Sequence, residues 1–298
     1  MITILGATGK VGGKIAGILI KEGEPVRLVA RSADHLRPLA GKQAETLAGD
    51  ALDTDFLVKA FTGTDTVFSL VPPNPKAEKF MSYADSIGGS IARALELAKV
   101  KYVVNLSSVG ADLPEGTGPI AGLHHQEARL NRIKGLYVLH LRPATFMENL
   151  LMNLDLIKTR GVTGNSIRGD LKFPMIATKD IAAYAAERLV RRDFTGSSVH
   201  YLLGRRDLSL IEATEIIGRK INKPGLSYTM FPYADAEKGL VAMGLSADVS
   251  RVYVEMGRAF NDGLIKYEQR TAENTTPTSF EEFCDDVFVP AFTQKKAA

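Results

Sequence analysis

Short apolar runs alternate with amphipathic stretches along the first half of the chain. The apolar runs predict strands at residues 2–5, 25–30, 44–48, 66–71, 102–106 and 136–141. Between them, apolar residues that recur every three or four positions predict helices at residues 14–21, 54–61, 82–99 and 122–133. Because strands that alternate with helices form parallel sheets covered on both faces, the pattern predicts a doubly wound α/β sheet. Its ligand site should lie at the carboxyl ends of the strands.

The second half of the chain follows a different pattern. An apolar run at residues 199–203 predicts a late edge strand, and later amphipathic stretches predict helices at residues 211–221 and 247–260. Polar residues at helix starts predict caps: Asp53 or Thr54, Thr178 with Asp180, and Ser209. Several large side chains here either wall a substrate pocket or belong to the core: Tyr228, Met230, Phe231, Tyr233, Met243, Met256 and Phe260.

A glycine-rich turn joins the first predicted strand to the first helix. Its glycines follow the spacing G-x-x-G-x-x-G at Gly6, Gly9 and Gly12. Gly6 permits a tight turn, Gly9 lets the backbone approach a pyrophosphate, and Gly12 lets the helix pack closely on the strand. The start of that helix then offers free N–H groups and a positive dipole end to phosphates. The turn therefore predicts a dinucleotide site.

The end of the second predicted strand carries Arg31 and no acidic residue. A carboxylate at this place receives the ribose 2′-hydroxyl of NAD, whereas an arginine suits the 2′-phosphate of NADP. We therefore expect NADP, with NAD less favoured; the alternative is that Arg31 is only a solvated charge at a strand end. Asp50 follows the third strand, where its carboxylate could reach the adenine amino group. Pro72 and the next proline force an extended exit from the fourth strand.

These features predict a two-part α/β architecture. Residues 1–150 form an NADP-binding Rossmann domain whose doubly wound parallel sheet is completed by residues 174–204. Residues 151–173 and 205–298 form a smaller, mostly helical C-terminal substrate or cap domain.

Composition narrows the class of protein without changing this picture. The chain has 298 residues, of which 45% are hydrophobic and 24% charged, with a net charge of +3. Its single cysteine, Cys284, excludes a disulfide framework and a cysteine-built zinc site, and is expected to be a buried apolar residue. The scattered Lys and Arg residues predict no nucleic-acid surface, and no apolar run approaches the roughly 18 residues of a membrane helix.

We therefore expect a soluble, cytoplasmic protein with a small-molecule substrate and no metal site. The chain enters a strand at once, which leaves no room for a signal peptide. The sequence leaves open whether the protein is a monomer or a homodimer.

Several stretches resemble the NmrA-like branch of the atypical short-chain dehydrogenase/reductase superfamily. They are the glycine turn, Leu106-Ser107-Ser108, residues 141–150 (LRPATFMENL), residues 174–182 (PMIATKDIA) and Leu208-Ser209 before a helix. The resemblance covers nearly the whole chain and is more specific for fold and nucleotide binding than for activity. It implies relatives such as NADPH-dependent quinone oxidoreductases, triphenylmethane reductases, and redox-sensing regulators that bind the cofactor without turnover.

The resemblance implies a role for each matching position. The pyrophosphate would be held by Gly6, Thr8, Gly9, Lys10, Val11 and Gly12, and the 2′-phosphate by Arg31. Adenine would lie beside Asp50 and Ala51, and the path from adenosine to ribose beside Leu70 and Pro72. The nicotinamide ribose would lie near Ser107, Ser108 and His124, and the nicotinamide against Pro143, Ala144 and Phe146.

The sequence departs from the superfamily at its catalytic pair. That pair is Tyr-x-x-x-Lys, in which the tyrosine donates a proton and the lysine lowers its pKa. Here the matching positions hold Ile120 and His124. His124 either binds the ribose or supplies a proton itself. Together with Ser107 and Ser108 it is a candidate catalytic residue. The alternative is that His124 and His125 form a solvated helix start.

The missing tyrosine changes the expected chemistry. Hydride transfer to an ordinary ketone builds an alkoxide, which benefits from a positioned acid. A quinone instead gives a stabilised phenolate-type anion, and a cationic dye becomes neutral. We therefore expect an NADPH-dependent oxidoreductase that acts on a quinone-like or other conjugated molecule. The alternative is a non-catalytic NADP(H) sensor that binds a protein partner.

Overall fold

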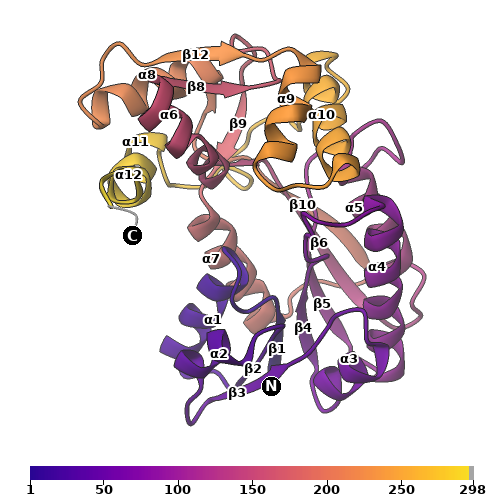
Figure 1. The fold of residues 1–298 in the computed structure, drawn as a ribbon. Helices are drawn as coiled ribbons and strands as arrows, with labels where there is room; N and C mark the ends of the chain where they lie inside the picture. Colours follow the sequence, from indigo (N-terminus) through magenta and orange to yellow (C-terminus); the bar gives the residue numbers. More distant parts are fainter. Residues whose placement is uncertain (295–298) are drawn as a thin grey trace.

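A parallel sheet forms the centre of the computed structural model, which describes residues 1–294 (Figure 1). Its seven strands lie in the order β10-β6-β5-β4-β1-β2-β3, and every neighbouring pair is parallel. The strands are β1 (Ile2–Leu5), β2 (Val26–Ala30), β3 (Ala44–Ala48), β4 (Thr66–Ser69), β5 (Tyr102–Leu106), β6 (Tyr137–Pro143) and β10 (Ser197–Leu202). The chain order reverses between β1 and β4, which is the switch point where sheets of this kind bind ligands at their carboxyl ends. The predicted doubly wound Rossmann fold is confirmed.

Helices cover both faces of this sheet (Figure 1). The helices of the sheet lobe are α1 (Gly12–Lys21), α2 (Ala33–Leu36), η1 (Arg37–Leu39), α3 (Thr54–Phe61), α4 (Phe80–Leu97), α5 (Pro119–Leu130) and α7 (Thr178–Arg191). One core joins the sheet to α1 and α7 through residues such as Ile15, Leu19 and Ile181. A second core joins the opposite face to α3 and α4 through Phe61 and Ile87. Burial on both faces explains why the strands read as continuous apolar runs.

The remaining elements form a smaller body above the carboxyl edge of the sheet, which we call the cap (Figure 1). Its elements are β7 (Thr145–Phe146), η2 (Met147–Asn153), α6 (Leu154–Arg160), β8 (Val162–Asn165), β9 (Phe173–Ile176), β11 (Asp207–Leu208), α8 (Leu210–Lys220), β12 (Ser227–Met230), α9 (Tyr233–Ala242), α10 (Ala247–Asn261), α11 (Phe280–Phe283), η3 (Cys284–Phe288) and α12 (Val289–Thr293). A third core fills it, and Cys284 is fully buried there as expected. Residues 295–298 of the predicted cap domain lie outside the described residues.

The segment at residues 174–204 divides its strands between two sheets. β10 adds to the edge of the main sheet beside β6, and α7 covers one face of that sheet. β9 instead pairs with β7 and β11 in a separate sheet of three short strands. The main sheet is therefore completed by β10 alone, because β9 finds its hydrogen-bond partners within the cap.

Local signals explain several helix boundaries. The Asp53 carboxylate caps α3, and Ser209 forms a capping box with Glu212 at the start of α8, as predicted. The predicted start of α5 at residue 122 is wrong, because Pro119 occupies the first turn directly after the positive φ of Gly118.

The predicted cap of α7 is also wrong. Both Thr178 and Asp180 lie inside the first turn of the helix rather than before it. The buried Glu148 carboxylate accepts hydrogen bonds from the Thr178 N–H and hydroxyl, and thereby caps the helix from a distant segment. Asp180 accepts hydrogen bonds from the backbone N–H and hydroxyl of Thr278, which ties the helix to the C-terminal segment.

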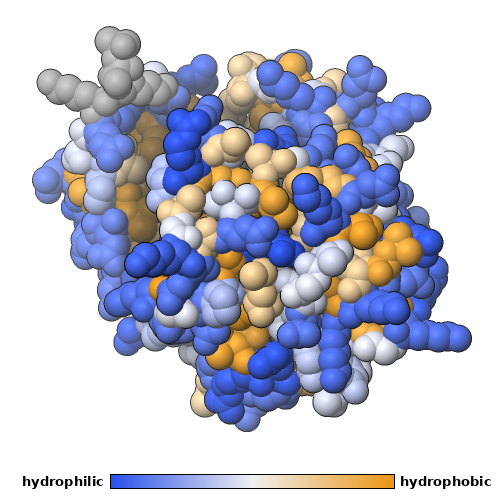
Figure 2. Space-filling model, turned by 90° about the horizontal axis from the view of Figure 1, so that it is seen from below, coloured by the Kyte–Doolittle hydropathy of each residue, from blue (hydrophilic) through white to orange (hydrophobic). Residues whose placement is uncertain are grey.

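Hydrophilic side chains cover most of the face seen in Figure 2, where apolar side chains form small separate patches. Among residues 1–294, no helix is both long and apolar enough to cross a bilayer. Within the same residues, no three His, Cys, Asp or Glu side chains are grouped as ligands for a metal ion.

Candidate cofactor site at the carboxyl edge of the sheet

The glycine turn has the shape that a pyrophosphate requires. Gly6 has a φ of +71°, which favours glycine, and a Cβ on Gly12 would lie only 2.4 Å from the Gly6 carbonyl oxygen. No side chain caps the start of α1, and its first turn contains no acidic residue. The Gly13 N–H already donates to the Gly9 carbonyl, but the positive end of the helix dipole is available to an anion. These residues fit the phosphates of a dinucleotide.

Tyr83, which projects from α4, interacts with three of the residues predicted for adenosine. The Tyr83 hydroxyl donates a 3.0 Å hydrogen bond to the Pro72 carbonyl oxygen. Burial raises the pKa of Tyr83, the positive charge of Arg31 opposes this shift, and the negative charge of Asp50 adds to it. Both charged residues therefore act on the same hydroxyl. Arg31 is exposed and forms no salt bridge within residues 1–294, so its guanidinium is free to meet a phosphate.

The residues predicted for the nicotinamide half meet where β5 and β6 end. The Ser107 N–H donates to the Leu141 carbonyl, and the Val109 N–H donates to the Pro143 carbonyl. Ser107, Pro143 and Ala144 are buried, whereas Ser108 is partly exposed. Leu70, at the end of β4, packs against Gly6, because a Cβ placed there would touch its side chain at 3.0 Å.

A buried polar network supports Ser107. Its hydroxyl donates a 2.5 Å hydrogen bond to Glu127 of α5. Arg142 of β6 donates from Nε and Nη2 to the two oxygens of Glu127, at 3.0 and 2.6 Å. The third guanidinium nitrogen donates to the Tyr201 hydroxyl at 2.9 Å. Burial alone would lower the pKa of Arg142, but the hydrogen bonds and charge of Glu127 outweigh burial and raise it above its ordinary value.

His124 and His125 lie within α5 and are half-buried, so the alternative of a solvated helix start is wrong. The Nδ1 atom of His124 lies 2.9 Å from the Ala111 carbonyl oxygen, and that of His125 lies 3.0 Å from the Asp85 carboxylate. Ile120, at the position matching the superfamily's tyrosine, is buried and only 6% exposed. No hydroxyl therefore stands at that position.

A second polar row crosses the sheet beneath this edge. Ser69 donates to the Asn105 carboxamide oxygen, and the Asn105 amide nitrogen lies 3.1 Å from His140 Nδ1. The other ring nitrogen of His140 lies 2.9 Å from the Asn131 carboxamide oxygen. Burial lowers the pKa of His140 to about 4, so its ring is neutral at neutral pH. The row satisfies polar groups on adjacent strands that would otherwise be buried without partners.

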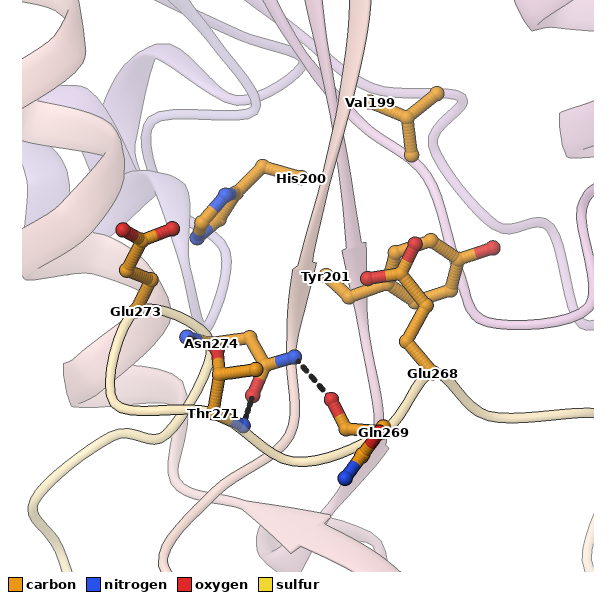
Figure 3. A pocket seen from close by; sticks show the side chains of 8 residues that line it. All are labelled: Val199, His200, Tyr201, Glu268, Gln269, Thr271, Glu273 and Asn274. Atoms are coloured by element: carbon orange, nitrogen blue, oxygen red, sulfur yellow. Dashed lines mark hydrogen bonds between the residues drawn. The ribbon is translucent and has the colours of Figure 1, made fainter.

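Two hollows lie away from the predicted cofactor edge. One, of about 230 Å³, lies between α1 and α7. The other, of about 340 Å³, follows the free side of β10, with His200 and Glu273 on one side of the strand and Tyr201 and Glu268 on the other (Figure 3). Neither contains a residue predicted to bind the cofactor. The second shares Tyr201 with the Ser107 network.

Sequence reasoning missed three residues of this edge. Arg142 stands inside the stretch LRPATFMENL, and Glu127 lies one helical turn after His124, so both positions were close to recognised signals. Tyr83 lies in the first turn of the long helix α4, where no local pattern marks it as a functional residue.

Comparisons with known proteins agree with this fold. The sequence model of the NmrA-like family matches residues 1–284. An NAD(P)H azoreductase from Xenophilus azovorans is 25% identical over 258 residues, which is 86% of each chain. The structure of an NADPH-dependent quinone oxidoreductase from Escherichia coli has a TM-score of 0.79 at 21% identity, covering 97% of this chain and 100% of the other. A Citrobacter triphenylmethane reductase complexed with NADP(H) has a TM-score of 0.80 at 17% identity, covering 96% and 99%.

Proposed function

Because the chain belongs to the NmrA-like family, we propose that it is an NADPH-dependent oxidoreductase that reduces a quinone-like or other conjugated small molecule. The observation that carries the proposal is the gathering of three groups at one sheet edge. They are the uncapped glycine turn, the Arg31 and Asp50 charges around Tyr83, and Ser107 beside Pro143. Each group suits a different part of one extended dinucleotide.

Each part of this edge has a distinct task in the proposal. The first turn of α1 binds the pyrophosphate, and Arg31 contacts the 2′-phosphate and selects NADPH over NADH. Ser107, Pro143 and Ala144 orient the nicotinamide half. The bound cofactor supplies a hydride, and the acceptor lies between the sheet edge and the cap.

The proposed acceptor follows from the side chains near Ile120. A Cβ on Gly110 would lie 3.7 Å from the Ile120 side chain and 3.3 Å from that of Ile265, so apolar groups surround this position. In the proposal, an acceptor that binds beside these groups is a flat aromatic molecule, because apolar surroundings exclude water. They provide no strong acid at the position of the superfamily's tyrosine. A conjugated acceptor fits because its reduced form needs no immediate protonation.

The relatives support the same class of substrate. The names of the azoreductase, the quinone oxidoreductase and the triphenylmethane reductase all describe reduction of conjugated molecules. They share a type of acceptor although their identity to this chain is low.

The proposal is tested by following NADPH oxidation at 340 nm with a panel of quinones, azo dyes, triphenylmethane dyes and simple ketones. We expect turnover with at least one conjugated class and none with the ketones, together with tighter binding of NADPH than of NADH. NADPH binding with no turnover on any acceptor would contradict the enzyme and favour the sensor. Absence of NADPH binding would refute both.

A further inference from the structure

The hydroxyl of Ser107 has one proton, and the structure directs that proton inward. Its partner is the Glu127 carboxylate, at 2.5 Å, and both residues are buried. Each oxygen of this carboxylate also accepts a hydrogen bond from Arg142, through Nε and Nη2. Two parallel N–H donors in this fork match an ionised carboxylate, which can only accept hydrogen bonds. Ser107 is therefore the donor in its bond to Glu127.

This network cannot carry protons between the hollow along β10 and the sheet edge. A relay through it would have to pass from Tyr201 through the guanidinium of Arg142. Arginine keeps its proton in proteins, and the bonds to Glu127 strengthen that tendency here. The network therefore fixes a direction of hydrogen bonding instead of moving a proton.

We propose that the Glu127–Arg142 pair holds Ser107 as a hydrogen-bond acceptor for the nicotinamide half of NADPH. Because its proton is used on Glu127, Ser107 presents only oxygen lone pairs to the cofactor edge. The matching groups on the cofactor are donors, namely a ribose hydroxyl or the carboxamide N–H. Glu127 is then a positioning residue that sets the polarity of Ser107. This inference rests on the proposed function, since it assumes that NADPH binds at this edge.

The same reasoning separates the two serines. Ser107 is buried with its proton in use, whereas Ser108 is partly exposed, and within residues 1–294 its hydroxyl has no hydrogen-bond partner. Only Ser108 therefore has a hydroxyl that is free to donate toward an acceptor molecule.

The test is a double-mutant cycle on NADPH affinity, measured by titrating the fluorescence of NADPH without any acceptor. Ser107→Ala removes the acceptor and should weaken binding roughly fivefold, the effect of one neutral hydrogen bond. Glu127→Gln places an amide donor beside Ser107, so that the Ser107 hydroxyl proton turns outward and faces a donor on the cofactor. We expect a similar loss of NADPH affinity. In the Ser107→Ala background, Glu127→Gln should cause no further loss of affinity, although it lowers the melting temperature in both backgrounds.

Matched variants on α4 control for each change. Ser86→Ala removes an exposed serine hydroxyl, and Glu96→Gln neutralises an exposed carboxylate paired with Arg93; both should leave NADPH affinity unchanged. Ser107→Cys is a further variant, in which Glu127 is unchanged. A thiol can still donate to the carboxylate but is a weak acceptor, so affinity should fall as it does for alanine.

The outcomes separate this inference from the proposed function. Failure of the unmodified protein to bind NADPH refutes the proposed function. If it binds but Ser107→Ala has no effect, if Ser107→Cys retains full affinity, or if the losses in the cycle simply add, the acceptor role of Ser107 is overturned. The 3-acetylpyridine analogue of NADPH lacks the carboxamide N–H. If Ser107→Ala no longer weakens binding of this analogue, the carboxamide is the donor to Ser107. If Ser107→Ala still weakens its binding, the donor is a ribose hydroxyl.

Discussion

Two glycines of α1 should respond in opposite directions to the same substitution. Gly12 begins the helix, and a Cβ there would lie 2.4 Å from the Gly6 carbonyl oxygen and 2.9 Å from its carbon. Both neighbours are backbone atoms of the glycine turn, so relief requires the helix to move away from β1. Overpacking of this kind costs about 1–3 kcal/mol. Gly17 lies later in the same helix, is exposed, and has nothing within 4 Å of its Cβ position.

Gly12→Ala should therefore lower the free energy of unfolding by about 1–3 kcal/mol, and each kcal/mol shifts the melting temperature by roughly 2–4 °C in a domain approaching this size. It should also weaken NADPH binding, because displaced N–H groups no longer converge on the pyrophosphate. Gly17→Ala should raise stability by about 0.5–1 kcal/mol through helix propensity and leave NADPH affinity unchanged. Denaturant unfolding and NADPH titration measure both quantities. If Gly12→Ala is as stable as the unmodified protein and binds NADPH equally well, the close contact at the turn has been misjudged.

Three further predictions concern other parts of the candidate site. Arg31→Ala should weaken NADPH binding roughly 10- to 100-fold, as expected for lost charge-assisted bonds, with little change for NADH; equal losses in the two titrations would contradict a 2′-phosphate contact. Tyr83→Phe leaves the Pro72 carbonyl without its donor and should cost about 1 kcal/mol in denaturant unfolding, a loss that would be absent if water replaced the hydroxyl fully. His140 has its pKa lowered to about 4, so the unfolded chain binds more protons between pH 6.5 and 4. Stability should therefore fall by about 3 kcal/mol as the pH drops through this window, and His140→Gln should remove most of that dependence.

Local patterns were sufficient wherever a segment's own residues decide its structure. The strand at residues 44–48 and the helix at residues 54–61 have the predicted bounds, because apolar period and the Asp53 cap act within a few residues. β9 was harder to assign, since its buried residues read like a strand of the main sheet. Its real partners, β7 and β11, are only two residues long and come from distant parts of the chain. The cap of α7 was misassigned for the same reason, because Glu148 reaches it across a loop.

In the candidate site, too, some features could be predicted from local sequence patterns and others could not. The glycine turn is a contiguous motif with a physical role at each glycine, so its conformation could be predicted from the sequence. The Glu127–Arg142 pair joins a helix to a strand, and no spacing rule connects their positions. Pairing of buried charges is a property of the folded chain, and it appears only once α5 has packed beside β5 and β6.

The segment that follows β4 links the cofactor edge to the cap. Its first part contains Pro72, whose carbonyl is held by Tyr83 close to the Arg31 and Asp50 charges. Its later part is hydrogen-bonded to the start of α10. The Ser246 N–H donates to the Pro75 carbonyl, and the Asp248 carboxylate accepts from the Phe80 N–H. A ligand that shifts the Pro72 end therefore acts on a segment hydrogen-bonded to α10. Because α10 packs Met256 and Phe260 against the core that contains Ile120, occupation of the adenosine end and the shape of the proposed acceptor site should depend on one stretch of backbone.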